Sequence, residues 1–292
     1  MSIGSLTKLD DRLSWLSKDN VRPYVLLRKE SRLKDPGKNF DLNWFSHKPL
    51  YMDPLLINDV YFADALLNME TRAFEHSDMA MPRWVFYDCG VLPGLITGFA
   101  LRTETLPQSI RTILGNENLK GEWTPVSMFI IIPTMVKGEW VAHNLSSINS
   151  MIPKEDRMHG LGFLSKAFGL AYGNINVCVG MTQWHSPALR LHSYYGNMEI
   201  LTAYTPAHTY ANTITYRVSV DPEHWKCFFT GDSPGDFEDK FVKTDYILDP
   251  YDEASQVSLH RRIEYCEGPF YLSSKQIKGN KPGSKLSIYK KL

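Results

Sequence analysis

The residues best suited to chemistry stand in one stretch, Ser150 to Phe163, which reads SMIPKEDRMHGLGF. This stretch follows an expected strand and leads into an expected helix. The first amides of a helix have no partner within the helix and carry a partial positive charge. Gly160 and Gly162 let the backbone approach an anion closely, because neither has a Cβ. The stretch therefore predicts a site for a phosphate or diphosphate group.

Positive charge gathers around the same turn. Lys154 and Arg157 precede the glycines, and Lys166 follows one helical turn later. No acid occurs between Arg157 and Leu170, although an acid in the first turn would ordinarily stabilise a helix. Its absence fits a turn that receives the negative charge of a ligand. The alternative is that the glycines serve only the turn itself.

The strands that must position this turn are read from apolar runs and turn residues. Residues 83–90 and 95–102 are two β-rich runs separated by a Gly/Pro turn, which predicts a hairpin. The run VSMFIII, 126–132, predicts a buried strand. The other expected strands are 22–30, 140–152, 174–181, 198–204 and 213–220.

Helices are expected where apolar residues recur every three to four positions. One spans 53–74, with Asp53 as cap and Pro54 in the first turn. A second spans 163–172. A third begins at Pro187 behind the cap Ser186 and closes at Gly196 as a C′ residue. The pattern predicts a mixed α/β fold over residues 22–220, followed by a segment of different texture.

Composition narrows the class of protein. Lys plus Arg and Asp plus Glu both number 32, and this balance argues against general binding to nucleic acid or membrane surfaces. The apolar runs are too short to span a bilayer, and the N-terminus lacks a signal-peptide core. The cysteines show neither disulfide nor metal-ligand spacing. We therefore expect a soluble, cytoplasmic protein that uses no metal. The cysteines are Cys89, Cys178, Cys227 and Cys266.

Residues 83–204 resemble the GNAT superfamily of N-acyltransferases, in that family's order. The family's cofactor loop, Arg/Gln-x-x-Gly-x-Gly/Ala, is matched by Arg157, Gly160 and Gly162, with one extra residue between Pro153 and the arginine. The preceding family hairpin is similar to GLITGFALR, 94–102. A second family pattern, Asn-x-x-Ala-x-x-Leu-Tyr-x-x-x-Gly-Phe, resembles residues 185–197. There Ala188, Leu191 and Gly196 are kept, while His185, His192 and Asn197 replace the asparagine, tyrosine and phenylalanine.

The resemblance implies a GNAT-like fold over residues 51–220. Residues 1–50 would form an N-terminal extension that supplies a first strand, and residues 221–292 an accessory segment. It also implies acetyl-CoA or another acyl-CoA as co-substrate, with the pantetheine arm between the strand ending near Met151 and Ile152 and the strand 174–181. The backbone around the glycines would hold the diphosphate. The implied cofactor residues are Met151, Ile152, Arg157, Met158, His159, Gly160, Leu161, Gly162 and Phe163.

The same resemblance implies direct attack of an amine on the thioester. His192 stands where the family often has a tyrosine that protonates the leaving thiolate, and a histidine suits this task near neutral pH. Tyr195 is the alternative, because it would lie three residues on along a helix. Glu139 and His143 flank the strand before the loop and are the candidates for the base. Each residue also has a reading without catalysis: His192 and Tyr195 would serve packing, and residues such as Glu139 and His143 are more often solvated on the surface than bases.

Several alternatives stay open. The donor could be an acyl carrier protein instead of CoA, docked by the lysines near the C-terminal end. The differences from the second family pattern at residues 185, 192 and 197 would fit a module that senses CoA or binds a partner without catalysis. An unrelated α/β nucleotide binder is a third reading. The acceptor is expected to be an amine of a small molecule, amino acid or peptide, and the sequence does not reveal the oligomeric state. The lysines in question are Lys275, Lys278, Lys281, Lys285, Lys290 and Lys291.

Overall fold

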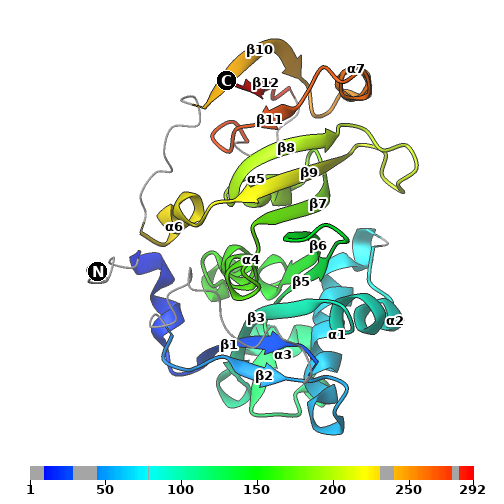
Figure 1. Ribbon diagram of the computed structural model, residues 1–292. Helices are drawn as coiled ribbons and strands as arrows, with labels where there is room; N and C mark the ends of the chain where they lie inside the picture. Colours follow the sequence, from blue (N-terminus) through cyan, green and yellow to red (C-terminus); the bar gives the residue numbers. More distant parts are fainter. Residues whose placement is uncertain (1–9, 29–44, 78, 231–239, 278–282) are drawn as a thin grey trace. The chain divides into compact units, whose positions relative to one another are not determined.

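Figure 1 shows the protein as a computed structural model, which describes residues 10–28, 45–77, 79–230, 240–277 and 283–292. The chain forms two compact units. The first combines residues 1–137 with 142–175, and the second combines 138–141 with 176–292. Each contains both sheet and helix, so the predicted mixed α/β class is confirmed. The predicted functional division after residues 50 and 220 stays a prediction.

The first unit is built on a mixed sheet with the strand order β6-β5-β3-β1-β2, and β4 pairs with β3. β1 runs parallel to β2 and antiparallel to β3, and β3 is antiparallel to both β4 and β5. The first residues of β6, up to Val141, belong to the second unit, and the rest of the strand, from Ala142, belongs to the first. The strands are β1 (Val21–Leu26), β2 (Leu50–Met52), β3 (Leu95–Arg102), β4 (Trp123–Pro125), β5 (Ser127–Pro133) and β6 (Glu139–Ser147).

Two helices, α1 (Val60–Phe74) and α4 (Leu161–Tyr172), cover opposite faces of this sheet. Thr97 of β3 donates its hydroxyl to the carbonyl of Ser165 on α4, at 3.3 Å. The next residue, Gly98, points to the other face, where a Cβ would lie 2.7 Å from the Tyr24 hydroxyl. Tyr24 packs edge-on against Phe62 of α1, with ring centroids 4.8 Å apart. The helices are α1 (Val60–Phe74), α2 (Arg83–Val85), α3 (Gln108–Leu114) and α4 (Leu161–Tyr172).

The second unit contains an antiparallel sheet with the order β10-β12-β11-β8-β9-β7. Its last three strands in sequence come from the segment after residue 220, so this segment extends the sheet begun by β7, β8 and β9. The strands are β7 (Val177–Gln183), β8 (Gly196–Thr202), β9 (Thr213–Val220), β10 (Phe241–Leu248), β11 (Phe270–Leu272) and β12 (Leu286–Lys291). The helices are α5 (Pro187–Ser193), α6 (Pro222–Thr230) and α7 (Glu253–Glu264).

Most expected elements are confirmed within a few residues. β9 matches the expected strand at 213–220, and α4 begins two residues before the expected helix at 163–172. The cap of α5 is confirmed, because the Ser186 side chain accepts a hydrogen bond from the amide of Ala188. The first expected strand is too long, because β1 ends at Leu26 and leaves Leu27 and Arg28 outside it. Its last two expected residues, Lys29 and Glu30, lie outside the described residues.

The expected hairpin is wrong in its first half. Residues 83–85 form α2, and Phe86–Val91 continue as a π-helix. Phe86 is fully buried, and the Arg83 guanidinium lies 2.6 Å from the Asp64 carboxylate on α1. The β-branched and aromatic residues of this run favour a strand by propensity, but burial against the rest of the unit decides such short segments.

Two expected helix boundaries are also wrong. α1 begins at Val60 instead of Asp53, because the Asp53 carboxylate accepts the amide of Leu55 at 3.0 Å and closes a separate turn. Gly196 does not end α5 but opens β8. A Cβ on Gly196 would lie 1.9 Å from the carbonyl oxygen of Ser219, so the glycine permits the close approach of β8 to β9.

Candidate functional site

The predicted anion loop joins β6 to α4 within the first unit. Two short 3₁₀ turns, Ile148–Ser150 and Lys154–Asp156, follow β6, and Gly160 then caps α4. Gly160 has φ 71° and ψ 9°, the left-handed conformation. This conformation costs a residue with a Cβ about 1–2 kcal/mol. The glycine therefore allows a turn into the helix that other residues would strain.

Side chains hold the carbonyl groups of this turn inside the protein. Trp15 Nε1 donates to the carbonyl of His159 at 3.0 Å, and the Ser165 hydroxyl donates to the carbonyl of Leu161 at 2.8 Å. In a trans peptide the carbonyl and the following N–H point in opposite directions. The amides of Gly160 and Gly162 therefore point away from Trp15 and Ser165. Neither amide donates a hydrogen bond to any group in the described part of the chain.

The loop that precedes these glycines is braced at both ends. The Asn149 side chain accepts from the amide of Met158 at 3.1 Å and donates to its carbonyl at 2.6 Å. The Arg157 Nε donates to the carbonyl of Ile152 at 3.0 Å. A loop held in this way loses little further freedom when a ligand binds.

The charges around the turn favour an anion. α4 has no acid in its first turn, and Arg157 is exposed beside it. The acid nearest in sequence, Asp156, accepts a hydrogen bond from the Ser109 hydroxyl at 2.6 Å. Asp10 also acts on the turn, because its charge raises the pKa of His159. The pKa of His159 is lowered by the surrounding protein and, to a smaller degree, by the Arg12 charge, so its ring is neutral at pH 7. Two outward amides, an adjacent guanidinium and no acid in the first turn fit a diphosphate.

The remaining predicted cofactor residues divide by burial. Ile152, Leu161 and Phe163 are buried in the first unit, so only their backbone is available to a ligand. Met151 and Met158 are half-buried. The resemblance had placed backbone amides, not side chains, on the diphosphate, and this division agrees with that expectation without testing it.

Two predicted catalytic residues lie in the interior of the second unit. His192 is 6% exposed, and its ring stacks on Tyr216 with centroids 5.1 Å apart. Tyr195 is 0% exposed. Both side chains therefore contribute to the packing of this unit, whatever further role they have.

The two predicted bases differ in their surroundings. The Glu139 carboxylate lies 3.2 Å from the Arg217 guanidinium, which also lies 3.5 Å from Glu199. His143, which belongs to the first unit, is exposed as a residue, yet the protein around its ring lowers its pKa below 6.5. His143 is therefore neutral at pH 7, the form that accepts a proton.

Sequence reasoning missed Trp15, Asn149 and Ser165 as supports of the loop. Trp15 lies on the 3₁₀ helix Asp11–Ser17 (η1) and is separated from His159 by 144 residues. No local pattern reports a contact over such a separation. Asn149 falls within the expected strand 140–152, and the sequence pattern gives its side chain no hydrogen-bond partner.

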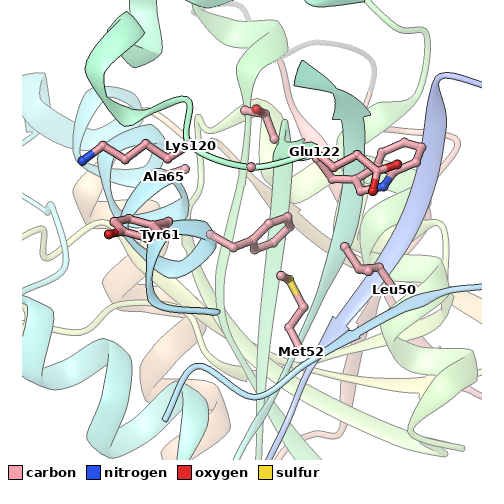
Figure 2. Close-up of a pocket in the computed structure, with 10 residues that line it drawn as sticks. Leu50, Met52, Tyr61, Ala65, Lys120 and Glu122 are labelled. Atoms are coloured by element: carbon pink, nitrogen blue, oxygen red, sulfur yellow. The ribbon is translucent and has the colours of Figure 1, made fainter. Parts of the chain in front are cut away.

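A cavity of about 260 Å³ lies elsewhere in the first unit. Figure 2 shows Tyr61 and Lys120 near one another across it from Leu50 and Met52, and Lys120 Nζ is 5.0 Å from the centre of the Tyr61 ring. No residue of the loop 150–163 lines this cavity, so it is a feature separate from the anion loop. Its lining is Leu50, Met52, Tyr61, Phe62, Ala65, Lys120, Gly121, Glu122, Trp123 and Thr124.

Two features are absent from the described residues. None of the helices there has the length and apolar character needed to cross a membrane. No group of three or more His, Cys, Asp or Glu side chains in that part of the chain is arranged to hold a metal ion.

Comparison with known proteins gave structural similarities only. No family model and no curated protein matches the sequence. The ribosomal-protein-S18-alanine N-acetyltransferase from Escherichia coli is similar at 14% identity and a TM-score of 0.35, over 54% of this chain and 86% of that one. A Desulfovibrio desulfuricans protein assigned to the GNAT family of acetyltransferases is similar at 15% identity and a TM-score of 0.34, over 55% and 94%. Nourseothricin acetyltransferase is similar at 7% identity and a TM-score of 0.29, over 44% and 66%.

Proposed function

We propose that this protein is an N-acyltransferase of the GNAT type, which moves an acyl group from acyl-CoA to an amine. The proposal depends on one observation. The amides of Gly160 and Gly162 point out of the turn and have no acceptor in the described part of the chain. Together with Arg157 they form a set of donors suited to the diphosphate of CoA.

The chain's own residues have limited tasks in such a reaction. When bound, acyl-CoA supplies a thioester whose carbonyl a neutral amine attacks directly. His143 has the protonation state required of a base at pH 7, whereas the Glu139 carboxylate is occupied by Arg217. His192 is the proposed acid for the leaving thiolate, and Tyr195 is the alternative. We expect the variant His192→Gln to lower kcat, with the affinity for CoA unchanged.

The donor and the location belong to the same proposal. We propose acetyl-CoA or another acyl-CoA as donor, because an outward diphosphate site serves either one. An acyl carrier protein is the alternative donor, and the described lysines that would meet it are Lys275, Lys285, Lys290 and Lys291. Lys278 and Lys281 lie outside the described residues. A CoA-dependent reaction and four cysteines in the thiol form are consistent with the cytoplasm.

Calorimetry and thermal unfolding with CoA, acetyl-CoA and a long-chain acyl-CoA test the proposal. A ligand at one hundred times its Kd stabilises the folded state by about 2.7 kcal/mol, which raises the Tm by several degrees. The proposal also requires release of free thiol from acyl-CoA in the presence of primary amines. Stabilisation by ATP with no response to any CoA compound would overturn it and favour a nucleotide binder.

A second function is favoured by one observation, the burial of His192 and Tyr195. If both serve packing alone, the loop would bind CoA without catalysis, and the protein would be a CoA sensor or an interaction module. Saturable CoA binding with no thiol release across a broad panel of amines would favour this function over the enzyme.

A further inference from the structure

The cavity of the first unit has an apolar floor. Leu50 and Met52 of β2 line it together with Phe62 and Ala65 of α1. Phe62 is 6% exposed and Ala65 is 3% exposed, so these two side chains line the cavity from the interior of the unit. Its volume of about 260 Å³ exceeds the roughly 150 Å³ of a cavity that binds benzene. The cavity therefore has room for one aromatic ring with a short chain attached.

Exposed residues leave the cavity open to solvent on another side. Tyr61 is 49% exposed, and Lys120, Gly121 and Glu122 are exposed as well. All four line the cavity. A Cβ placed on Gly121 would meet nothing nearer than the carbonyl oxygen of Trp123, at 3.8 Å. A ligand can therefore enter from this side without any rearrangement of the packed core.

The charges at the cavity favour an anionic ligand. Lys120 and Glu122 are the charged residues among the described lining. The Glu122 carboxylate lies 2.7 Å from the Arg102 guanidinium, so a neighbouring cation offsets its charge. Lys120 Nζ lies 5.0 Å from the centre of the Tyr61 ring and forms no ion pair with any described acid. The Lys120 ammonium group is therefore available to a carboxylate.

The polar and apolar groups of the cavity are separated in space. Figure 2 shows the ammonium group of Lys120 and the hydroxyl group of Tyr61 directed to the same side, away from Leu50 and Met52. Ligand sites commonly combine an apolar lining with a few polar groups that fix the orientation of the ligand. A ligand with an apolar body and one anionic end fits this separation.

We propose that this cavity binds a small aromatic monocarboxylate, whose ring lies among Met52, Phe62 and Trp123 and whose carboxylate meets Lys120 and Tyr61. Aromatic side chains attract a ligand ring by edge-to-face and offset-stacked contacts, and methionine sulphur also contacts rings favourably. The inference goes beyond the proposed function, because no residue of the anion loop lines the cavity and the binding requires no CoA.

Titration calorimetry with three probes of similar shape tests the class of ligand. The probes 3-phenylpropionate, 3-phenylpropionamide and 3-phenylpropylamine carry a negative charge, no charge and a positive charge. We expect 3-phenylpropionate to bind with a Kd below about 1 mM. The amide should bind about threefold to tenfold more weakly, and the amine more weakly still. Absence of binding by all three probes, or binding of the amide as tight as that of the carboxylate, would overturn the inference.

A signal from Met52 shows whether the probe enters this cavity. In protein labelled with carbon-13 at the methionine methyl groups, the ring of bound 3-phenylpropionate should shift the Met52 resonance, which the variant Met52→Leu assigns. Met135 is 105% exposed and does not line the cavity, so its resonance is the internal control and should not move. A shift of other methionines with Met52 unchanged would place the probe elsewhere and contradict the inference.

The variant Lys120→Gln tests the role of the charge. It should weaken the binding of 3-phenylpropionate about threefold to tenfold and leave the Kd of the amide unchanged, so that the preference for the carboxylate disappears. Lys137→Gln makes the same change at an exposed lysine outside the cavity and is the matched control, which should keep the preference. A Lys120→Gln variant with the full preference would refute the assignment of the carboxylate to this residue.

Two further variants occupy the cavity with a side chain. Ala65→Leu extends into it from α1 and should weaken the binding of 3-phenylpropionate at least about tenfold, with the Tm unchanged or raised. Because added volume can also destabilise a packed site, Gly121→Phe narrows the cavity from the exposed side and should have the same effect on binding. Either variant, folded and with the wild-type Kd for 3-phenylpropionate, would overturn the inference. The Kd of CoA should stay unchanged in both, so a failure here is distinct from a failure of the proposed function.

Discussion

The substitution Gly160→Ala tests whether the left-handed conformation of residue 160 is needed for CoA binding, and it measures what that conformation costs in stability. Gly160 has φ 71°, and an alanine held there costs about 1–2 kcal/mol. The protein has two responses. It keeps the turn and loses this stability, or it relieves the strain by rotating the peptide between residues 159 and 160. That rotation breaks the Trp15 bond to the His159 carbonyl and turns the amide of residue 160 inward.

The magnitude follows from the bond that is lost. A hydrogen bond to a charged group contributes about 1.5–3 kcal/mol, so an amide withdrawn from a diphosphate weakens CoA binding by about tenfold to a hundredfold. Strain retained in the free protein lowers the Tm by about 2–8 °C. Isothermal titration calorimetry with CoA at fixed ionic strength measures the first effect, and scanning calorimetry measures the second.

Gly283→Ala is the matched control for strain. Gly283 also has a positive φ, 86°, and a Cβ there meets nothing within 4 Å, so its alanine variant should lose similar stability and keep the Kd of CoA. The Tm of Gly160→Asn and its Kd for CoA should both lie between those of the wild type and those of Gly160→Ala, because asparagine tolerates the left-handed region better than alanine. If Gly160→Ala binds CoA with the wild-type Kd, the amide of residue 160 does not contact the ligand and the reasoning fails.

Three further predictions concern single residues. Trp15→Phe removes the donor to the His159 carbonyl and should increase amide hydrogen exchange across residues 158–162, seen by mass spectrometry; unchanged exchange would show that the bond does not hold the loop. Gly180→Ala places a Cβ 2.3 Å from the hydroxyl of the fully buried Tyr216 and should cost about 1–3 kcal/mol in urea unfolding; a neutral result would mean that the ring has room to move. Burial raises the pKa of Glu70 above 4.5, so the folded state binds more protons than the unfolded state above that pH, and stability should fall as pH rises through the folded pKa. Glu70→Gln should remove this dependence in unfolding experiments between about pH 4 and 8, and a dependence that persists would assign it to another group.

Local patterns predicted the elements that matter most for the site. The apolar face of residues 163–172 identified α4, and the glycines identified the turn before it. Ser186 and Pro187 identified the start of α5 because capping is a local interaction. In each case the information lies within a few residues of the element.

The errors arose where packing at a distance decides the structure. Residues 83–90 have strand propensity, yet they are helical because Phe86 is buried and Arg83 pairs with Asp64. The supports of the anion loop could not be predicted for a similar reason. Trp15 meets His159 across 144 residues of sequence, and only the folded chain brings them together.

The most direct test of the central claim is a crystal structure of the protein with CoA bound. We predict that oxygen atoms of the diphosphate lie about 2.7–3.2 Å from the amide nitrogens of both Gly160 and Gly162, with the Trp15 bond to the His159 carbonyl intact. A structure in which CoA binds elsewhere, or in which these two amides turn into the protein, would contradict it.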